Sequence, residues 1–110
     1  ETVSHLYTAS DPAVLRLIQM TLDAAEANSI PCSMCGEMAG DVLYTPLLLG
    51  MGLREFSMAA QAIAEVKRVL RAVSIEQAKK VAAEAMALAT AGEVSDFLAA
   101  KGQELLPEQE

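Results

Sequence analysis

Several residue types that carry chemistry or mark a cellular setting are scarce in this sequence. Its 110 residues include no tryptophan, two tyrosines, two phenylalanines, one histidine and two cysteines. Stacking platforms for bases or sugars are therefore not expected. With so few cysteines and no signal-peptide pattern, a reducing, cytoplasmic setting is the natural expectation.

Basic residues are also few. Eight lysines and arginines stand against 15 aspartates and glutamates, which gives a formal net charge of −7. Binding to nucleic acid requires a basic surface, so no nucleic-acid partner is expected. Lys67, Arg68 and Arg71 do cluster, and we interpret this cluster as a solvated helix face or a partner contact rather than a phosphate site.

Long hydrophobic runs are absent although hydrophobic residues make up 53% of the chain. The run over 46–51 contains Gly50, and the run over 81–86 contains Glu84. Neither approaches the roughly 18 apolar residues of a transmembrane helix, so no membrane segment is predicted. The length allows one domain with a core, but not a complete (β/α)8 barrel of about 250 residues.

The most informative stretch is I-P-C-S-M-C-G-E-M-A-G-D at 30–41. Its first half alternates as a strand does, which predicts Ile30, Cys32 and Met34 on one face and Ser33 and Cys35 on the other. Cys32 is then expected to pack in the interior. Cys35, at the carboxyl end of the strand, is expected to face a ligand cleft.

The second half of the stretch predicts a loop. Gly36 breaks the strand, Glu37 supplies a carboxylate, and Asp41 is expected to cap a helix after Gly40. Parallel α/β proteins build active sites on such strand ends, and a helix N-terminus there would favour an anion. Because an ordinary thiol is mostly protonated at neutral pH, it can act as a general acid. We therefore predict that Cys35 is the chemically active residue.

Other interpretations of the C-x-x-C spacing remain open. A structural zinc site needs four ligands, and the chain offers two cysteines and the distant His5, which we expect to be an exposed loop residue. A dithiol redox centre places its first cysteine at a helix N-terminus, whereas Cys32 lies within the predicted strand. Both thiols could also simply pack as small apolar side chains.

Helices are predicted on both sides of this stretch. Asp11 and Pro12 start one that ends at Asn28, and a second helix begins either at Thr45 or after a separate turn at 42–45, because Pro46 is unfavourable inside a helix. Gly50 and Gly52 are expected to close it. The positions predicted to be buried recur every three or four residues in these helices: Val14, Leu15, Ile18, Leu22, Ala25, Leu43, Leu47 and Leu48.

A second short strand is predicted over 53–58, followed only by helices. Capping boxes open two of them, at Ser74 and Thr90, and residues 101–110 are expected to form a frayed polar tail. The inward positions predicted for this half are Phe56, Met58, Ile63, Val66, Val69, Leu70, Ala78, Val81, Ala82, Ala85, Leu88, Val94, Phe97 and Leu98. Two parallel strands do not form a stable sheet alone, so the pattern predicts part of a larger α/β structure.

Three segments give the sequence a family resemblance: M-C-G-E-M-A-G-D at 34–41, L-L-L-G-M-G-L-R-E-F-S-M at 47–58, and E-V-K-R-V-L-R at 65–71. Together with S-H-L-Y and D-P-A-V-L-R-L-I near the start, they resemble the enzyme I family of the bacterial phosphoenolpyruvate:sugar phosphotransferase system. The resemblance reaches about residue 100. The related pyruvate phosphate dikinases and phosphoenolpyruvate synthases share the cysteine-glycine pair and differ around it.

The resemblance implies that residues 1–110 are the carboxy-terminal part of a TIM-type (β/α)8 barrel, with its last two strands and closing helices. That barrel binds phosphoenolpyruvate and Mg²⁺ and forms a homodimer in the cytoplasm. Cys35 matches the cysteine that protonates the enolate to give pyruvate, and Gly36 and Glu37 are expected only to shape the loop. The phosphoryl group passes through a histidine of a separate domain, which His5 does not match, to the carrier protein HPr.

The resemblance also implies that the phosphate-binding arginines and the Mg²⁺ ligands belong to earlier strands, outside this chain. The isolated chain is accordingly expected to lack phosphotransferase activity. An alternative of another class is an oligomerisation or interaction module, in which strand edges and apolar helix faces pair with another chain.

Overall fold

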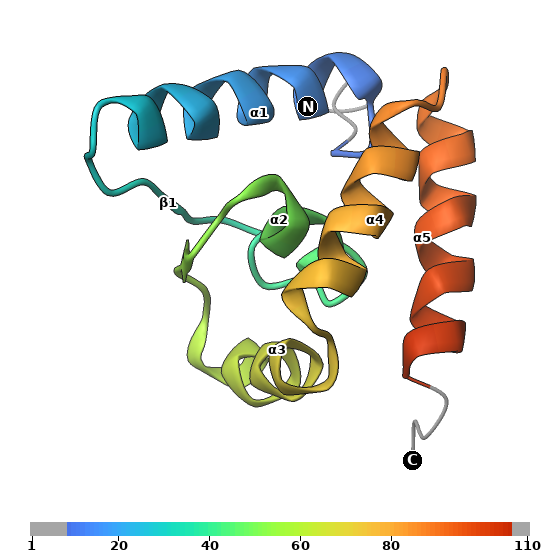
Figure 1. Cartoon of the computed structure of the whole chain (residues 1–110). Coiled ribbons are helices and arrows are strands. Elements are labelled where there is room, and N and C mark those ends of the chain that lie inside the picture. The colour runs from blue at the N-terminus through green and yellow to red at the C-terminus, as the bar shows by residue number, and fades with distance from the viewer. Residues whose placement is uncertain (1–8, 107–110) are drawn as a thin grey trace, which may run out of the picture.

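The computed structural model describes residues 9–106, which form five helices and one pair of short strands (Figure 1). The order of these elements is α1 (Pro12–Ala27), β1 (Ser33–Met34), α2 (Thr45–Met51), β2 (Glu55–Phe56), α3 (Ala60–Ala72), α4 (Ile75–Met86) and α5 (Ala91–Leu105). The predicted order of helix, strand, helix, strand and three helices is confirmed. His5 lies outside the described residues.

Helix α1 begins and ends as its sequence predicts. The Asp11 carboxylate accepts a hydrogen bond from the backbone N–H of Ala13 at 2.8 Å, and Pro12 occupies the first turn. At the other end Ser29 adopts a left-handed φ of 57°, and Ile30 N–H donates to the carbonyl of Ala25. Ile30 therefore belongs to the turn that ends α1, and its predicted inward position is wrong because its side chain is 59% exposed.

Strands β1 and β2 pair in parallel, with Ser33 opposite Glu55 and Met34 opposite Phe56. Both strands are shorter than the sequence predicted. Within the described residues each strand pairs with only one other, so few inter-strand hydrogen bonds keep the backbone extended. The alternation itself is confirmed: Cys32 and Met34 are partly buried, whereas Ser33 and Cys35 are exposed.

Helix α2 is the centre of the fold. In Figure 1 it lies between α1 and α3 and beside α4, while α5 covers the far side of α4. Every residue of α2 except Gly50 is buried. The helix begins at Thr45 as predicted, and residues 42–44 form the separate turn that the sequence offered as the alternative. Gly52 ends the helix with a left-handed φ of 115°. Gly50 lies within the helix and does not close it.

The three later helices pack as predicted except at a few positions. Val66 and Val69 of α3 are buried, but Ile63 is 43% exposed, so its predicted inward position is wrong. The capping box predicted at Ser74 is complete, with both of its hydrogen bonds formed. At Thr90 the side chain accepts from Glu93 N–H, but the Glu93 carboxylate accepts from Ala89 N–H, so the second box is only half formed.

Helix α5 runs on to Leu105, and Leu106 is buried. The structure thus differs from the predicted frayed tail over 101–106, because Leu105 and Leu106 pack against a small core formed by Leu49, Val69, Val73 and Ala78. In the part of the chain described here, every helix is too short or too polar to cross a membrane.

Candidate functional site

Cys35 follows β1 directly, at its carboxyl end. Its side chain is exposed, whereas Cys32 is partly buried and packs against the main core. The two thiols therefore have different surroundings, as the strand alternation predicted. In extended backbone, residues three apart are about 10 Å apart, beyond the roughly 7 Å that a disulfide can span. This conformation does not suit a dithiol redox centre.

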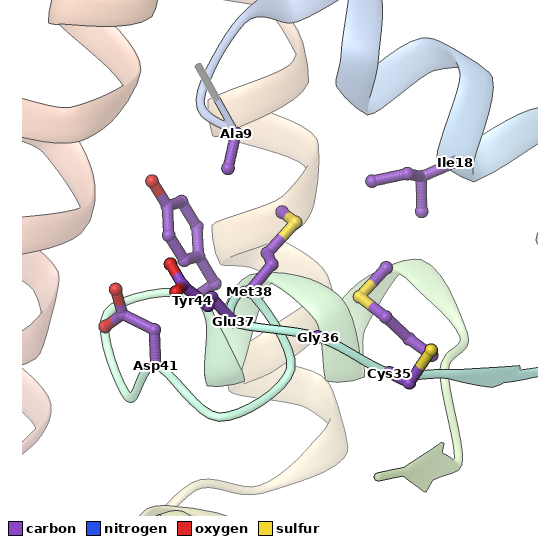
Figure 2. Close-up of a pocket in the computed structure, with 9 residues that line it drawn as sticks. Ala9, Ile18, Cys35, Gly36, Glu37, Met38, Asp41 and Tyr44 are labelled. Atoms are coloured by element: carbon purple, nitrogen blue, oxygen red, sulfur yellow. The ribbon is translucent and has the colours of Figure 1, made fainter. Parts of the chain in front are cut away.

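Cys35 lies beside an open pocket of about 590 Å³ (Figure 2). One wall of this pocket is the loop that leaves β1, and the opposite wall contains Ala9 and, from α1, Ile18. Glu37, Asp41 and Tyr44 also border it, so the predicted site residues Cys35, Gly36 and Glu37 lie together. Cys35 further borders a pocket of about 480 Å³ on the side of Ser57 and Met58.

The loop from Gly36 to Tyr44, which we call the site loop, is shaped by local turns. Gly36 has a φ of 98°, a conformation that residues with a side chain rarely adopt, and a β-carbon there would meet no atom within 4 Å. Gly40 N–H donates to the carbonyl of Glu37 at 3.2 Å. Met38 and Ala39 are buried and fix the middle of the loop to the fold.

Asp41 does not cap a helix. Its carboxylate accepts from the backbone N–H of Leu43 at 3.0 Å, and its carbonyl accepts from Tyr44 N–H. This local turn occupies the chain until α2 begins at Thr45. The prediction of a helix start directly after Gly40 is therefore wrong, and the site loop has no helix N-terminus at that point to favour an anion.

Tyr44 adds a functional group to the pocket that the sequence did not reveal. Its hydroxyl lies 2.9 Å from the Ser10 hydroxyl, and the Ser95 hydroxyl donates to Ser10 at 2.8 Å. Tyr44 is 34 positions from Ser10 along the chain, and Ser95 is 85 positions from it. No local pattern of apolar spacing or turn residues could have indicated that they meet.

The pocket beside Cys35 is acidic. Glu37 and Asp41 are the charged residues among those that line it, and no lysine or arginine of the described chain borders it. An anionic ligand in this pocket would therefore need cationic groups from elsewhere. No group of three or more histidine, cysteine, aspartate or glutamate side chains within residues 9–106 is placed to hold a metal ion.

Comparisons with known proteins point to one family. Residues 1–75 match the family model described as PEP-utilising enzyme, PEP-binding domain. The chain is also similar over 98 residues to proteins named phosphoenolpyruvate-protein phosphotransferase, from Staphylococcus carnosus at 43% identity and from Haemophilus influenzae at 44%. The aligned region is 89% of this chain and 17% of each relative, so the chain spans about a sixth of their length.

Proposed function

This chain belongs to the PEP-utilising enzymes, through their PEP-binding domain, and on that premise we propose that it is the carboxy-terminal part of a phosphoenolpyruvate-protein phosphotransferase. The whole enzyme would take the phosphoryl group of phosphoenolpyruvate onto a histidine of another domain, pass it to HPr and release pyruvate in the cytoplasm. The exposed thiol of Cys35 in the pocket at the end of β1 carries this proposal.

Cys35 would be the proton donor. Transfer of the phosphoryl group breaks the bond between phosphorus and the bridging oxygen, and leaves the enolate of pyruvate. The S–H bond of Cys35 then breaks as its proton forms a C–H bond at the methylene carbon, which gives pyruvate. The thiolate regains a proton from solvent. An exposed thiol that borders three open pockets suits both steps, since substrate and water can each reach it.

Gly36 and Glu37 would shape and position the loop next to this thiol. They do not supply the positive charge that phosphate and carboxylate groups require, and the acidic lining of the pocket makes that need greater. We therefore place the phosphate-binding cations in other parts of the longer polypeptide. We place the Mg²⁺ ligands in those other parts too, since residues 9–106 hold no group of three or more potential metal-ligating side chains.

The parallel pair β1 and β2, with α2 between them in sequence, would be the last two strands of a (β/α)8 barrel. Their outer edges would then pair with neighbouring barrel strands. Residues 1–110 would form one piece of that domain, and its isolated form would be inactive because the rest of the substrate site is missing.

An interaction module is the second candidate, favoured by one observation. Leu17 and Met20 of α1 are 63% and 66% exposed, which is unusual for large apolar side chains on one helix. Such a face would pair with another chain or with a second copy. Sedimentation of the 110-residue chain separates these outcomes, since a single monomeric species across concentrations would contradict self-association.

The phosphotransferase proposal is tested in a chimera, in which this chain replaces the aligned segment of the Staphylococcus carnosus relative. The chimera should phosphorylate HPr from phosphoenolpyruvate and release pyruvate, whereas the 110-residue chain alone should not. Cys35→Ala should slow pyruvate release by about 100-fold or more while phosphoenolpyruvate still binds. Cys32→Ala is the matched control and should retain turnover. Unchanged turnover in Cys35→Ala would contradict the assignment.

A further inference from the structure

Three hydroxyl groups connect the site loop to the last helix. Tyr44 ends the site loop, Ser10 precedes α1, and Ser95 lies on α5. The Ser10 hydroxyl lies 2.9 Å from that of Tyr44 and accepts from Ser95 at 2.8 Å. Ser10 is completely buried, so water cannot replace either partner. The middle member of this hydroxyl chain is thus interior, whereas Tyr44 and Ser95 at its two ends are partly exposed.

Ser95 is the donor in its bond to Ser10, whereas either hydroxyl could donate between Ser10 and Tyr44. A serine hydroxyl carries one hydrogen and can accept from two donors. Because Ser95 donates to Ser10, the hydrogen of Ser10 is best satisfied by the oxygen of Tyr44. Each of the two serine hydrogens then has an acceptor. Loss of Tyr44 or of Ser95 leaves the buried Ser10 hydroxyl without one of its two partners, which couples the three residues.

The hydroxyl chain is the long-range hydrogen-bonded support of the site loop within residues 9–106. The loop's other hydrogen bonds are local, such as Gly40 N–H to Glu37 and Tyr44 N–H to Asp41. Burial of Met38 and Ala39 holds its middle. Its far end is bonded to α2 through the Tyr44 carbonyl, which accepts from Leu48 N–H, and to segments distant in sequence through the Tyr44 hydroxyl, which contacts Ser10 and, through Ser10, Ser95 of α5.

We propose that Tyr44, Ser10 and Ser95 are positioning residues, which hold the site loop so that Glu37 and the pocket wall keep their place beside Cys35. The effect of these residues on catalysis rests on the proposed function. Their effect on the position of the site loop does not. The matched family segment ends at residue 75, before α5 begins at Ala91. The proposal thus assigns α5 a role in a site that lies within the matched segment.

Hydrogen exchange of the 110-residue chain tests the structural part. Tyr44→Phe and Ser95→Ala each remove one hydroxyl, and each should speed amide exchange over 36–44 by about three- to tenfold. Amides of the buried helix α4 should keep their exchange rates. Thr21→Ala is the control, because the Thr21 hydroxyl donates to the Leu17 carbonyl on the exposed side of α1, and it should leave the site loop unchanged.

The double variant Tyr44→Phe/Ser95→Ala makes this test sharper. If both residues act through Ser10, the second substitution should add little to the first. Ser95→Thr retains a hydroxyl and should restore slow exchange. Unchanged exchange in the site loop would overturn the proposal, as would equal acceleration in the loop and in α4, which would indicate general loss of stability.

Kinetics of the chimera test the catalytic part. Tyr44→Phe and Ser95→Ala should lower kcat several-fold and leave KM for phosphoenolpyruvate nearly unchanged, because a misplaced loop affects the reacting geometry more than initial binding. Ser95→Thr should recover kcat. A loosened loop with unchanged kcat would overturn the positioning role. A chimera that is inactive before any of these substitutions would count against the proposed function, and hydrogen exchange would still decide whether the hydroxyl chain holds the loop.

Discussion

Gly50 of α2 lies so close to Ala78 of α4 that a β-carbon at position 50 would overlap the carbonyl oxygen of Ala78. The same β-carbon would stand 3.0 Å from the β-carbon of Ala82. Both obstacles belong to the backbone or to its first side-chain atom, so neither can rotate away. The close packing of these two helices therefore depends on the missing side chain of Gly50.

Gly50→Ala should destabilise the fold for this reason. The two helices would have to separate, and overpacking of this kind costs about 1–3 kcal/mol or more. Gly102→Ala is a matched control, since Gly102 also lies in a helix but a β-carbon there would meet nothing within 4 Å. That substitution should stabilise by about 0.5–1 kcal/mol. Urea unfolding measures both free energies, and equal effects would contradict the close approach.

Leu15 and Leu17 of α1 offer a test of which helix face is the core face. Leu15 is fully buried and Leu17 is 63% exposed, although they are two positions apart. Leu15→Ala should cost about 2–5 kcal/mol because it leaves a cavity. Leu17→Ala should change the free energy of unfolding by less than about 0.5 kcal/mol. A large cost at Leu17 would instead indicate that this face is covered by another chain in solution.

Ser74 and Gln77 satisfy each other's backbone groups at the start of α4. Gln77 N–H donates to the Ser74 hydroxyl at 3.1 Å, and Ser74 N–H donates to the Gln77 side chain at 2.9 Å. Ser74→Ala removes the first of these bonds and should cost about 1 kcal/mol. Ser33→Ala, on the exposed face of β1, should cost less. Thermal unfolding of the two variants compares them, and equal melting temperatures would argue against the cap.

Periodic and capping patterns predicted most of the helical fold. Asp11 and Ser74 correctly predicted helix starts, because the side-chain oxygen accepts from a backbone N–H only a few residues away and this bond depends on local sequence alone. The exposure of Ile63 was not predictable in the same way. The spacing of apolar residues shows which face of a helix is apolar, but not how far the neighbouring elements cover that face. The continuation of α5 to Leu105 likewise depends on a distant core that includes Val69.

The candidate site was only partly predictable. Alternation along the strand correctly separated Cys32 from Cys35, because it depends on backbone geometry alone. The supposed helix cap at Asp41 was wrong because an aspartate makes the same kind of bond to a backbone N–H in a simple turn. The contact of Tyr44 with Ser10 joins segments far apart in the sequence, so tertiary structure alone reveals it.

Gly36 sets the direction in which the site loop leaves β1. Its φ of 98° is strained for a residue with a β-carbon, while the space around it is open. Gly36→Ala should therefore cost about 1–2 kcal/mol through the backbone alone. Gly92→Ala is the control, because Gly92 lies in α5 with equal space and no positive φ. Denaturant unfolding checks the pair, and a neutral Gly36→Ala would show that the loop readily adopts another path.

Cys35 and Cys32 should differ in reactivity as they differ in exposure. Iodoacetamide should alkylate Cys35 several-fold faster than Cys32, which packs against the core beside Met34. Mass spectrometry of the digested chain measures each site separately. In urea the two rates should converge, because the difference comes from the fold and not from the neighbouring sequence. Comparable rates in the folded chain would mean that Cys32 is as accessible to solvent as Cys35. That result would contradict the assignment of a packing role to Cys32 and a reactive role to Cys35.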